Sequence, residues 1–72
     1  MFTIYKLIKV NLNADGMITH TYTAGYYACK LEAVKLLTEL NCKHLYDDFG
    51  LEFWASKEND RVRYWIEPVA VK

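Results

Sequence analysis

The hydrophobic period of the chain changes twice along its length, and this change limits the fold more than any other feature. Residues 2–12 and 17–24 alternate between two sets of side chains, and residues 51–57 and 61–67 do so again. Between these segments, residues 26–42 place apolar side chains at helical spacing. A period of two is typical of a strand, and a period of about 3.6 is typical of a helix. The pattern therefore predicts two β-hairpins joined through one helix.

The turn of the first hairpin is predicted at Asn13-Ala14-Asp15-Gly16, because Gly is the residue best able to adopt a positive φ. A three-residue loop with Gly16 in a bulge collects the apolar side chains of both strands on one face. The register that follows pairs Leu12 with Ile18, Val10 with His20 and Ile8 with Tyr22.

The segment 26–42 is predicted to be an amphipathic helix that frays near Asn41, with residues 47–50 in a loop. Ala, Leu, Glu and Lys dominate the segment, as a helix prefers. Its apolar stripe is predicted to consist of Tyr26, Cys29, Ala33, Leu36, Leu37 and Leu40.

The second hairpin is predicted to turn at Asn59-Asp60, since a two-residue loop keeps the alternating sets of both strands together. Trp54 then lies directly opposite Trp65. Pro68 is expected to end the pairing or to mark an edge, because it has no backbone N–H to donate.

These elements predict an α+β fold with one domain over residues 1–72. It is a two-layer ββαββ sandwich in which one helix packs on one face of a four-stranded sheet made of antiparallel hairpins. Two strand orders satisfy short connections. In sequence numbering of the four strands, these are 2-1-4-3 and 2-1-3-4.

Composition excludes several classes of function. Nine basic and nine acidic side chains give a net charge of zero, which argues against a DNA mimic and against a general polyanion binder. Two cysteines are too few for a disulfide framework, so a reduced, cytoplasmic setting is predicted. Lysines interrupt every apolar stretch, and no membrane segment is expected.

The chemically reactive residues do not form a recognisable catalytic or metal-binding pattern. Cys42 and His44 lie two residues apart, but a structural zinc site usually has two close ligand pairs. Cys29 is predicted to be a core residue of the helix. At a helix C-terminus, Cys42 would have a raised pKa, which is unsuited to nucleophilic attack. We therefore expect no enzyme activity, catalytic residue, metal or cofactor.

One helix covers one sheet face, so the other face is predicted to be uncovered and to bind a partner. Trp, Tyr and Arg are the side chains that contribute most to interfaces, and large exposed apolar patches mark contact sites. The predicted partner-binding residues on this face are Tyr5, Leu7, Lys9, Trp54, Arg63 and Trp65. A cross-strand Trp54–Trp65 pair that only supports the hairpin is the structural alternative.

The functional prediction is a small non-enzymatic protein-interaction module whose partner is another protein or a second copy of the chain. The layout is similar to that of the small α+β proteins of phages and mobile elements, and this resemblance implies an inhibitor that binds and blocks a partner. The alternative is a module for single-stranded nucleic acid, in which bases stack on the same aromatic and basic face.

Overall fold

A computed structural model describes residues 1–72, and it confirms the α+β class with one helix and an antiparallel sheet. The sheet has five strands, so the prediction of four strands is wrong. The elements in chain order are β1 (Phe2–Leu12), β2 (Ile18–Tyr27), α1 (Lys30–Glu39), β3 (Cys42–Asp48), β4 (Leu51–Ser56) and β5 (Val62–Val71).

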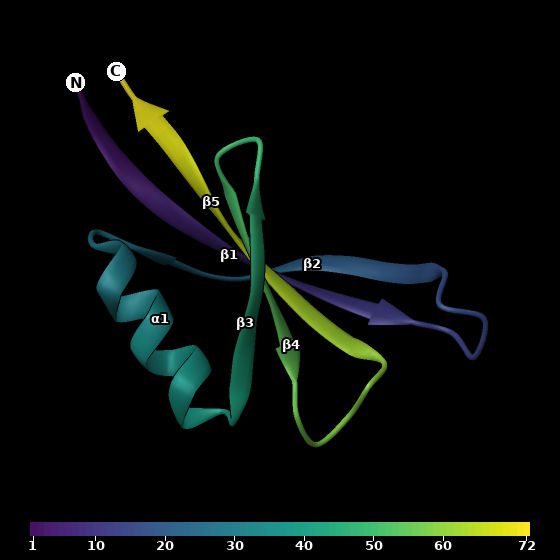
Figure 1. Ribbon diagram of the computed structural model, residues 1–72. Helices are drawn as coiled ribbons and strands as arrows, with labels where there is room; N and C mark the ends of the chain where they lie inside the picture. Colours follow the sequence, from purple (N-terminus) through teal and green to yellow (C-terminus); the bar gives the residue numbers. More distant parts are fainter.

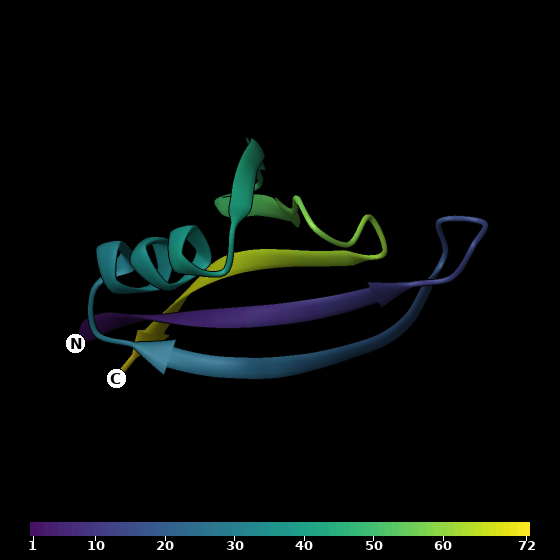
Figure 2. The same ribbon diagram turned by 90° about the horizontal axis from the view of Figure 1, so that it is seen from below.

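The strand order is β2-β1-β5-β4-β3, and every neighbouring pair is antiparallel. For the four predicted strands this is the order 2-1-4-3, one of the two left open. β1 and β5 pair along almost their whole length, from Phe2–Val71 to Asn11–Val62, so the two chain ends lie side by side (Figure 1). The sheet twists strongly, and the β3–β4 hairpin stands across the direction of β1 and β5 (Figure 2).

The first turn forms as predicted, but the register beyond it differs. Gly16 has a φ of 81°, and the N–H of Asn13 donates to the carbonyl of Met17 over 2.8 Å, which closes the loop. Leu12 pairs with Ile18, which confirms that part of the register. The next residue, Thr19, is extra, so the predicted partners of Val10 and Ile8 are wrong: the observed partners are Thr21 and Thr23.

The helix is shorter than predicted at both ends. Tyr26 belongs to β2, and α1 ends where Asn41 adopts a φ of 59°, a left-handed conformation that Asn tolerates well. Of the predicted stripe, Ala33 and Leu37 are buried and Leu36 packs at the core margin. The other three predicted members, Tyr26, Cys29 and Leu40, are exposed. No helix of this fold has the length and apolar character needed to cross a bilayer.

β3 replaces what was predicted to be the helix end and a loop. Its seven residues are exposed except for Cys42, so they lack the alternation of buried and exposed positions that marks a strand. A β-bulge between His44 and Tyr46 also interrupts the period of two. β3 is therefore a strand because of its pairing with β4, and its own hydrophobic pattern does not predict one.

The β4–β5 register is one residue away from the prediction. Five residues, 57–61, connect the strands, and Ser56 Oγ accepts from the N–H groups of Glu58 and Asn59. The observed pairs are Trp54–Tyr64 and Phe53–Trp65, so Trp54 does not face Trp65. Because a one-residue shift exchanges the faces of a strand, Trp54 lies on the face opposite to the one predicted.

Pro68 does not end β5, which continues to Val71. Proline is tolerated here because β4 pairs with β5 only as far as Ile66. Beyond that residue, β1 is the sole neighbour of β5.

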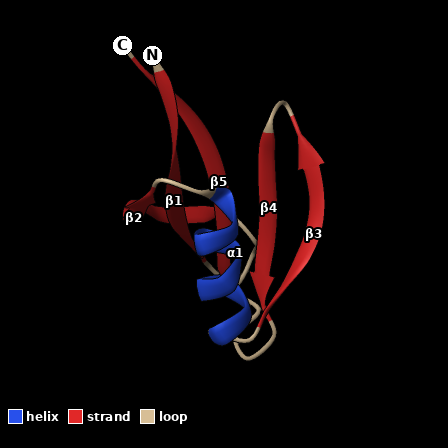
Figure 3. Cartoon of the chain, turned by 90° about the vertical axis from the view of Figure 1, so that its left-hand side faces the viewer, coloured by secondary structure: helices blue, strands red, loops and turns tan.

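The core lies between α1 and the face of the sheet that we call the helix face. The backbone of α1 lies closest to β3, β1 and β2. In the view of Figure 3, β1 and β2 are on one side of the helix and β4 and β3 on the other. The buried cluster consists of Leu7, Ala33, Leu37, Cys42, Trp54, Tyr64 and Ile66. We call the reverse side of the sheet the open face.

We predict that Leu37→Ala lowers the free energy of unfolding by about 2–5 kcal/mol, because it leaves a cavity between helix and sheet. Leu31→Ala, in the same helix but 71% exposed, should change it by less than about 0.5 kcal/mol. Urea denaturation followed by circular dichroism measures both. Equal effects of the two substitutions would contradict the placement of α1.

Candidate functional site: the open face of the sheet

The structure divides the predicted partner-binding residues between the two faces. Arg63 and Trp65 lie on the open face, as predicted, since they pair with Val10 and Ile8. Leu7 and Trp54 are core residues on the helix face, with exposed fractions of 0% and 8%. Tyr5 and Lys9 share that face, because they alternate with Leu7 along β1. The prediction that these four residues share a face with Arg63 and Trp65 is therefore wrong.

A row of three aromatic side chains crosses the open face instead, and we call it the aromatic row. Tyr46 of β3 stacks on Phe53 of β4, with ring centroids 4.9 Å apart. Phe53 in turn meets Trp65 of β5 at 6.1 Å with the rings tilted. Each ring comes from a neighbouring strand, as expected for cross-strand pairs. Tyr46 is 55% exposed and forms the outer end of the row.

The aromatic row forms part of the wall of an apolar groove. Its volume is about 170 Å³, and eight of its nine lining residues are hydrophobic. Leu12 and Ile18, from the β1–β2 end, line it together with Leu45 and Tyr46 of β3. The twist of the sheet therefore brings residues of its two edge strands, β2 and β3, onto one concave surface. The buried indole N–H of Trp65, also at this groove, has no acceptor within the protein.

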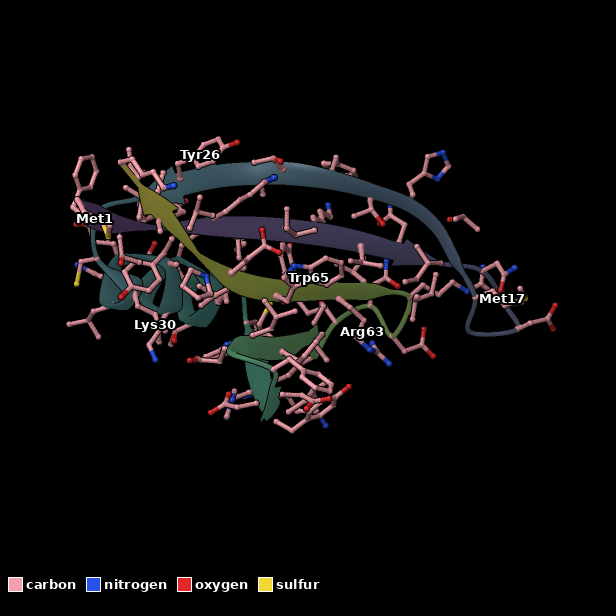
Figure 4. All side chains as sticks on the ribbon, turned by 90° about the horizontal axis from the view of Figure 1, so that it is seen from above. Met1, Met17, Tyr26, Lys30, Arg63 and Trp65 are labelled. Atoms are coloured by element: carbon pink, nitrogen blue, oxygen red, sulfur yellow. The ribbon has the colours of Figure 1, made fainter.

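A basic hollow adjoins the groove. It has a volume of about 350 Å³ and is lined by Lys43, Lys57 and Arg63, with Asp60 as its acidic member. Arg63 and Leu45 line both the hollow and the groove. Nη1 of Arg63 donates to the carbonyl oxygen of Asp60 over 2.7 Å, which holds the guanidinium at the boundary. In Figure 4, Arg63 and Trp65 lie away from the helix and from Lys30.

The helix face carries a polar network at its margin. Nε1 of Trp54 donates to Oε1 of Glu52 over 2.9 Å, and Nζ of Lys30 lies 3.2 Å from Oε2. The hydrogen bond and charge of Glu52 raise the pKa of Lys30. Both oxygens of Glu52 are thus engaged, and Lys30 fixes the start of α1 to β4.

The same network contains the one grouping with metal-ligand chemistry. The bulge in β3 puts His44 and Asp47 on one face, where His44 Nε2 lies 2.7 Å from Asp47 Oδ1. Ligand atoms of these two residues and of Glu52 lie within 4.8 Å of one another. A cation bound there would face the Lys30 ammonium beside Glu52, and Coulomb repulsion opposes this arrangement. We therefore assign the grouping as an ion-pair network.

Three ionisable side chains on the helix face, Lys9, Cys42 and Tyr64, have a raised pKa. Burial raises the pKa of the Cys42 thiol, so the pKa has the predicted direction but the cause is desolvation rather than a helix end. Burial also raises the pKa of Tyr64. A hydrogen bond to Tyr22 raises the pKa of Lys9, whose Nζ lies 5.8 Å from the centroid of that ring.

Sequence reasoning missed Tyr46, Phe53, Leu45 and Lys43 as members of the open face. Phe53 alternates with Trp54, so the predicted register, which put Trp54 on the uncovered face, implied the opposite face for Phe53. The other three residues lie in a strand that was not predicted. The Phe49-Gly50 turn, in which both residues have a positive φ, is the one local signal that marks the β3–β4 hairpin.

Comparison of the chain with protein-family models, curated proteins and solved structures finds no match. The function is therefore inferred from the chemistry of the open face.

We predict that Glu52→Ala lowers the free energy of unfolding by about 1–3 kcal/mol, because it removes the acceptor of the Trp54 indole. Glu52→Gln should cost less than about 1 kcal/mol, because the amide oxygen still accepts and the Lys30 ammonium of the lost ion pair is half exposed to solvent. Urea titrations of the two variants, with tryptophan emission as the probe, measure the difference. Equal losses would show that the charge, and not the hydrogen bond, matters.

Proposed function

We propose that this protein is a non-enzymatic protein-interaction module that binds a partner protein through the aromatic row and the apolar groove of the open face. The observation that carries the proposal is the groove itself: a concave, almost wholly hydrophobic surface whose lining includes the partly exposed Tyr–Phe–Trp row. Side chains of these types are the usual anchors of protein interfaces.

The size of the groove favours a polypeptide over a metabolite. Pockets for small molecules usually enclose about 300–1,000 Å³. The groove offers about 170 Å³, which suits one or two apolar side chains of a partner. Arg63 at its margin adds a cation that can pair with a carboxylate of the partner. Binding of this kind blocks whatever surface the partner presents, which is the expected action of an inhibitor.

We predict that Leu45→Ala combined with Tyr46→Ala weakens partner binding at least about tenfold while the fold is kept. Both side chains line the groove and are exposed, so their loss leaves no core cavity. The matched control is Leu31→Ala with Tyr26→Ala, which removes the same side-chain types from other exposed positions.

The measurement is quantitative affinity enrichment from an extract of the source cells, followed by titration calorimetry with the purified partner. Proteins retained by the wild type and by the control, but not by the groove variant, support the proposal. Equal retention by all three proteins would reject the groove as the binding surface.

The basic hollow favours a second candidate, a module for single-stranded nucleic acid. Lys43, Lys57 and Arg63 lie next to three aromatic rings, and bases stack on such rings while phosphates meet the cations. Net charge is zero, so this attraction is local rather than a property of the whole chain.

For this candidate we predict quenching of tryptophan emission by a thymidine oligonucleotide at low salt. Three phosphate contacts give a slope of log affinity against log salt of about −2. Lys43→Gln with Lys57→Gln should reduce that slope, whereas Lys35→Gln with Lys72→Gln, at exposed positions elsewhere, should not. Absence of quenching would remove nucleic acid and leave the protein partner unaffected.

A further inference from the structure

The outer edge of β2 is an unpaired strand edge ten residues long. β2 is the first strand of the sheet and lies on the side away from the β3–β4 hairpin (Figure 2). Residues 18–24 of this strand are all exposed. Tyr26, which is 60% exposed, projects from the same border of the sheet (Figure 4).

β2 has none of the charged or proline residues that usually protect such an edge. Its sequence, Ile-Thr-His-Thr-Tyr-Thr-Ala-Gly-Tyr-Tyr, is rich in β-branched and aromatic residues. Edge strands of soluble proteins are normally short, charged or interrupted by proline, because an open edge pairs with another strand. β3, the other edge strand, follows this rule: it is shorter and carries Lys43, Asp47 and Asp48.

Two β-bulges limit the part of β2 that can pair regularly. The extra residues are Thr19 and Ala24, at the two register shifts between β1 and β2. The regular stretch between them is His20–Thr23, with Tyr22 on the helix face and the two threonines on the open face. Thr21 and Thr23 oppose Val10 and Ile8 of β1.

We propose that the β2 edge binds the β2 edge of a second copy of this chain, which gives a two-fold dimer with one continuous ten-stranded sheet. In antiparallel strands, directly opposed side chains share a face, so a two-fold axis must pass through a residue paired with itself. Of the two central residues of the regular stretch, we place the axis at Tyr22, because an aromatic pair flanked by Thr–Thr pairs is stabilising in a sheet. Thr21 then opposes Thr23 of the second copy, and both helices lie on the same side of the sheet.

Charge favours a second copy as the occupant. The chain has no net charge, and β2 itself has no charged residue, so two copies approach without repulsion. Lys9 of β1 lies over the Tyr22 ring, so in the dimer each copy supplies a cation next to the tyrosine pair. Aromatic and Thr–Thr cross-strand pairs are also among the stabilising ones in sheets.

The test is sedimentation equilibrium of the whole chain over a series of concentrations. The wild type should rise from 8.5 kDa toward twice that mass. Thr21→Lys with Thr23→Lys places four lysines close together at the two-fold axis of the dimer. In the monomer both positions are exposed to solvent, so the fold should tolerate the lysines. The dissociation constant of the dimer should therefore rise at least about tenfold. The control, Leu31→Lys with Thr38→Lys, adds the same charge on the exposed side of α1 and should leave the dissociation constant unchanged.

Hydrogen exchange separates edge pairing from stacking of faces. Backbone amides of His20–Thr23 that point away from β1 should be protected only at concentrations where the dimer forms. A wild type that stays at 8.5 kDa throughout, or a lysine variant that dimerises as well as the wild type, would overturn the proposal. The Leu45/Tyr46 groove variant should still dimerise, so the two surfaces are tested independently.

Discussion

Packing of α1 against the sheet through Leu37 and Ala33 is the interaction on which the rest of the structure depends. With only ten of 72 residues buried, the fold has one small core and no second one to replace it. The helix covers the face that carries Leu7, Ile66 and Trp54. No other helix covers the rest of the sheet, and this explains why so many large apolar side chains are exposed.

The twist of the sheet partly compensates for the missing second layer. Ile8 and Val10 lie on the open face and are nevertheless buried. Trp65 and Arg63 lie opposite them on β5, and Val10 lines the groove together with Leu45 and Tyr46 of β3. The groove and the aromatic row are therefore products of the same curvature that completes the burial of β1. A binding surface and a structural requirement coincide at these residues.

The elements with a strong hydrophobic period could be predicted from the sequence. The strand β3 and the strand registers could not, because they depend on which strands pair. The first turn, the position of the helix and one of the two proposed strand orders follow from local patterns such as Asn13–Gly16. β3 could not be predicted, because an exposed edge strand with a bulge has no hydrophobic alternation. The register of β4 and β5 depends on the length of the loop between them. Ser56 stabilises a five-residue loop, and the loop sequence has no feature that predicts this length. The one-residue shift exchanged the faces of Phe53 and Trp54. Tyr5, Leu7 and Lys9 were assigned to the wrong face for a different reason, the register between β1 and β5, which places them on the face opposite to that of Arg63 and Trp65.

The pairing of Phe2 with Val71 brings the two ends of the chain to one pole of the molecule. A peptide linker joining them would span only the gap between adjacent strands, about 5 Å. Circular permutation is thus geometrically open to this fold, with new termini at the exposed Phe49-Gly50 turn. A fluorescent protein fused next to Phe2 or Val71 would likewise leave from the same pole, away from Arg63 and Trp65.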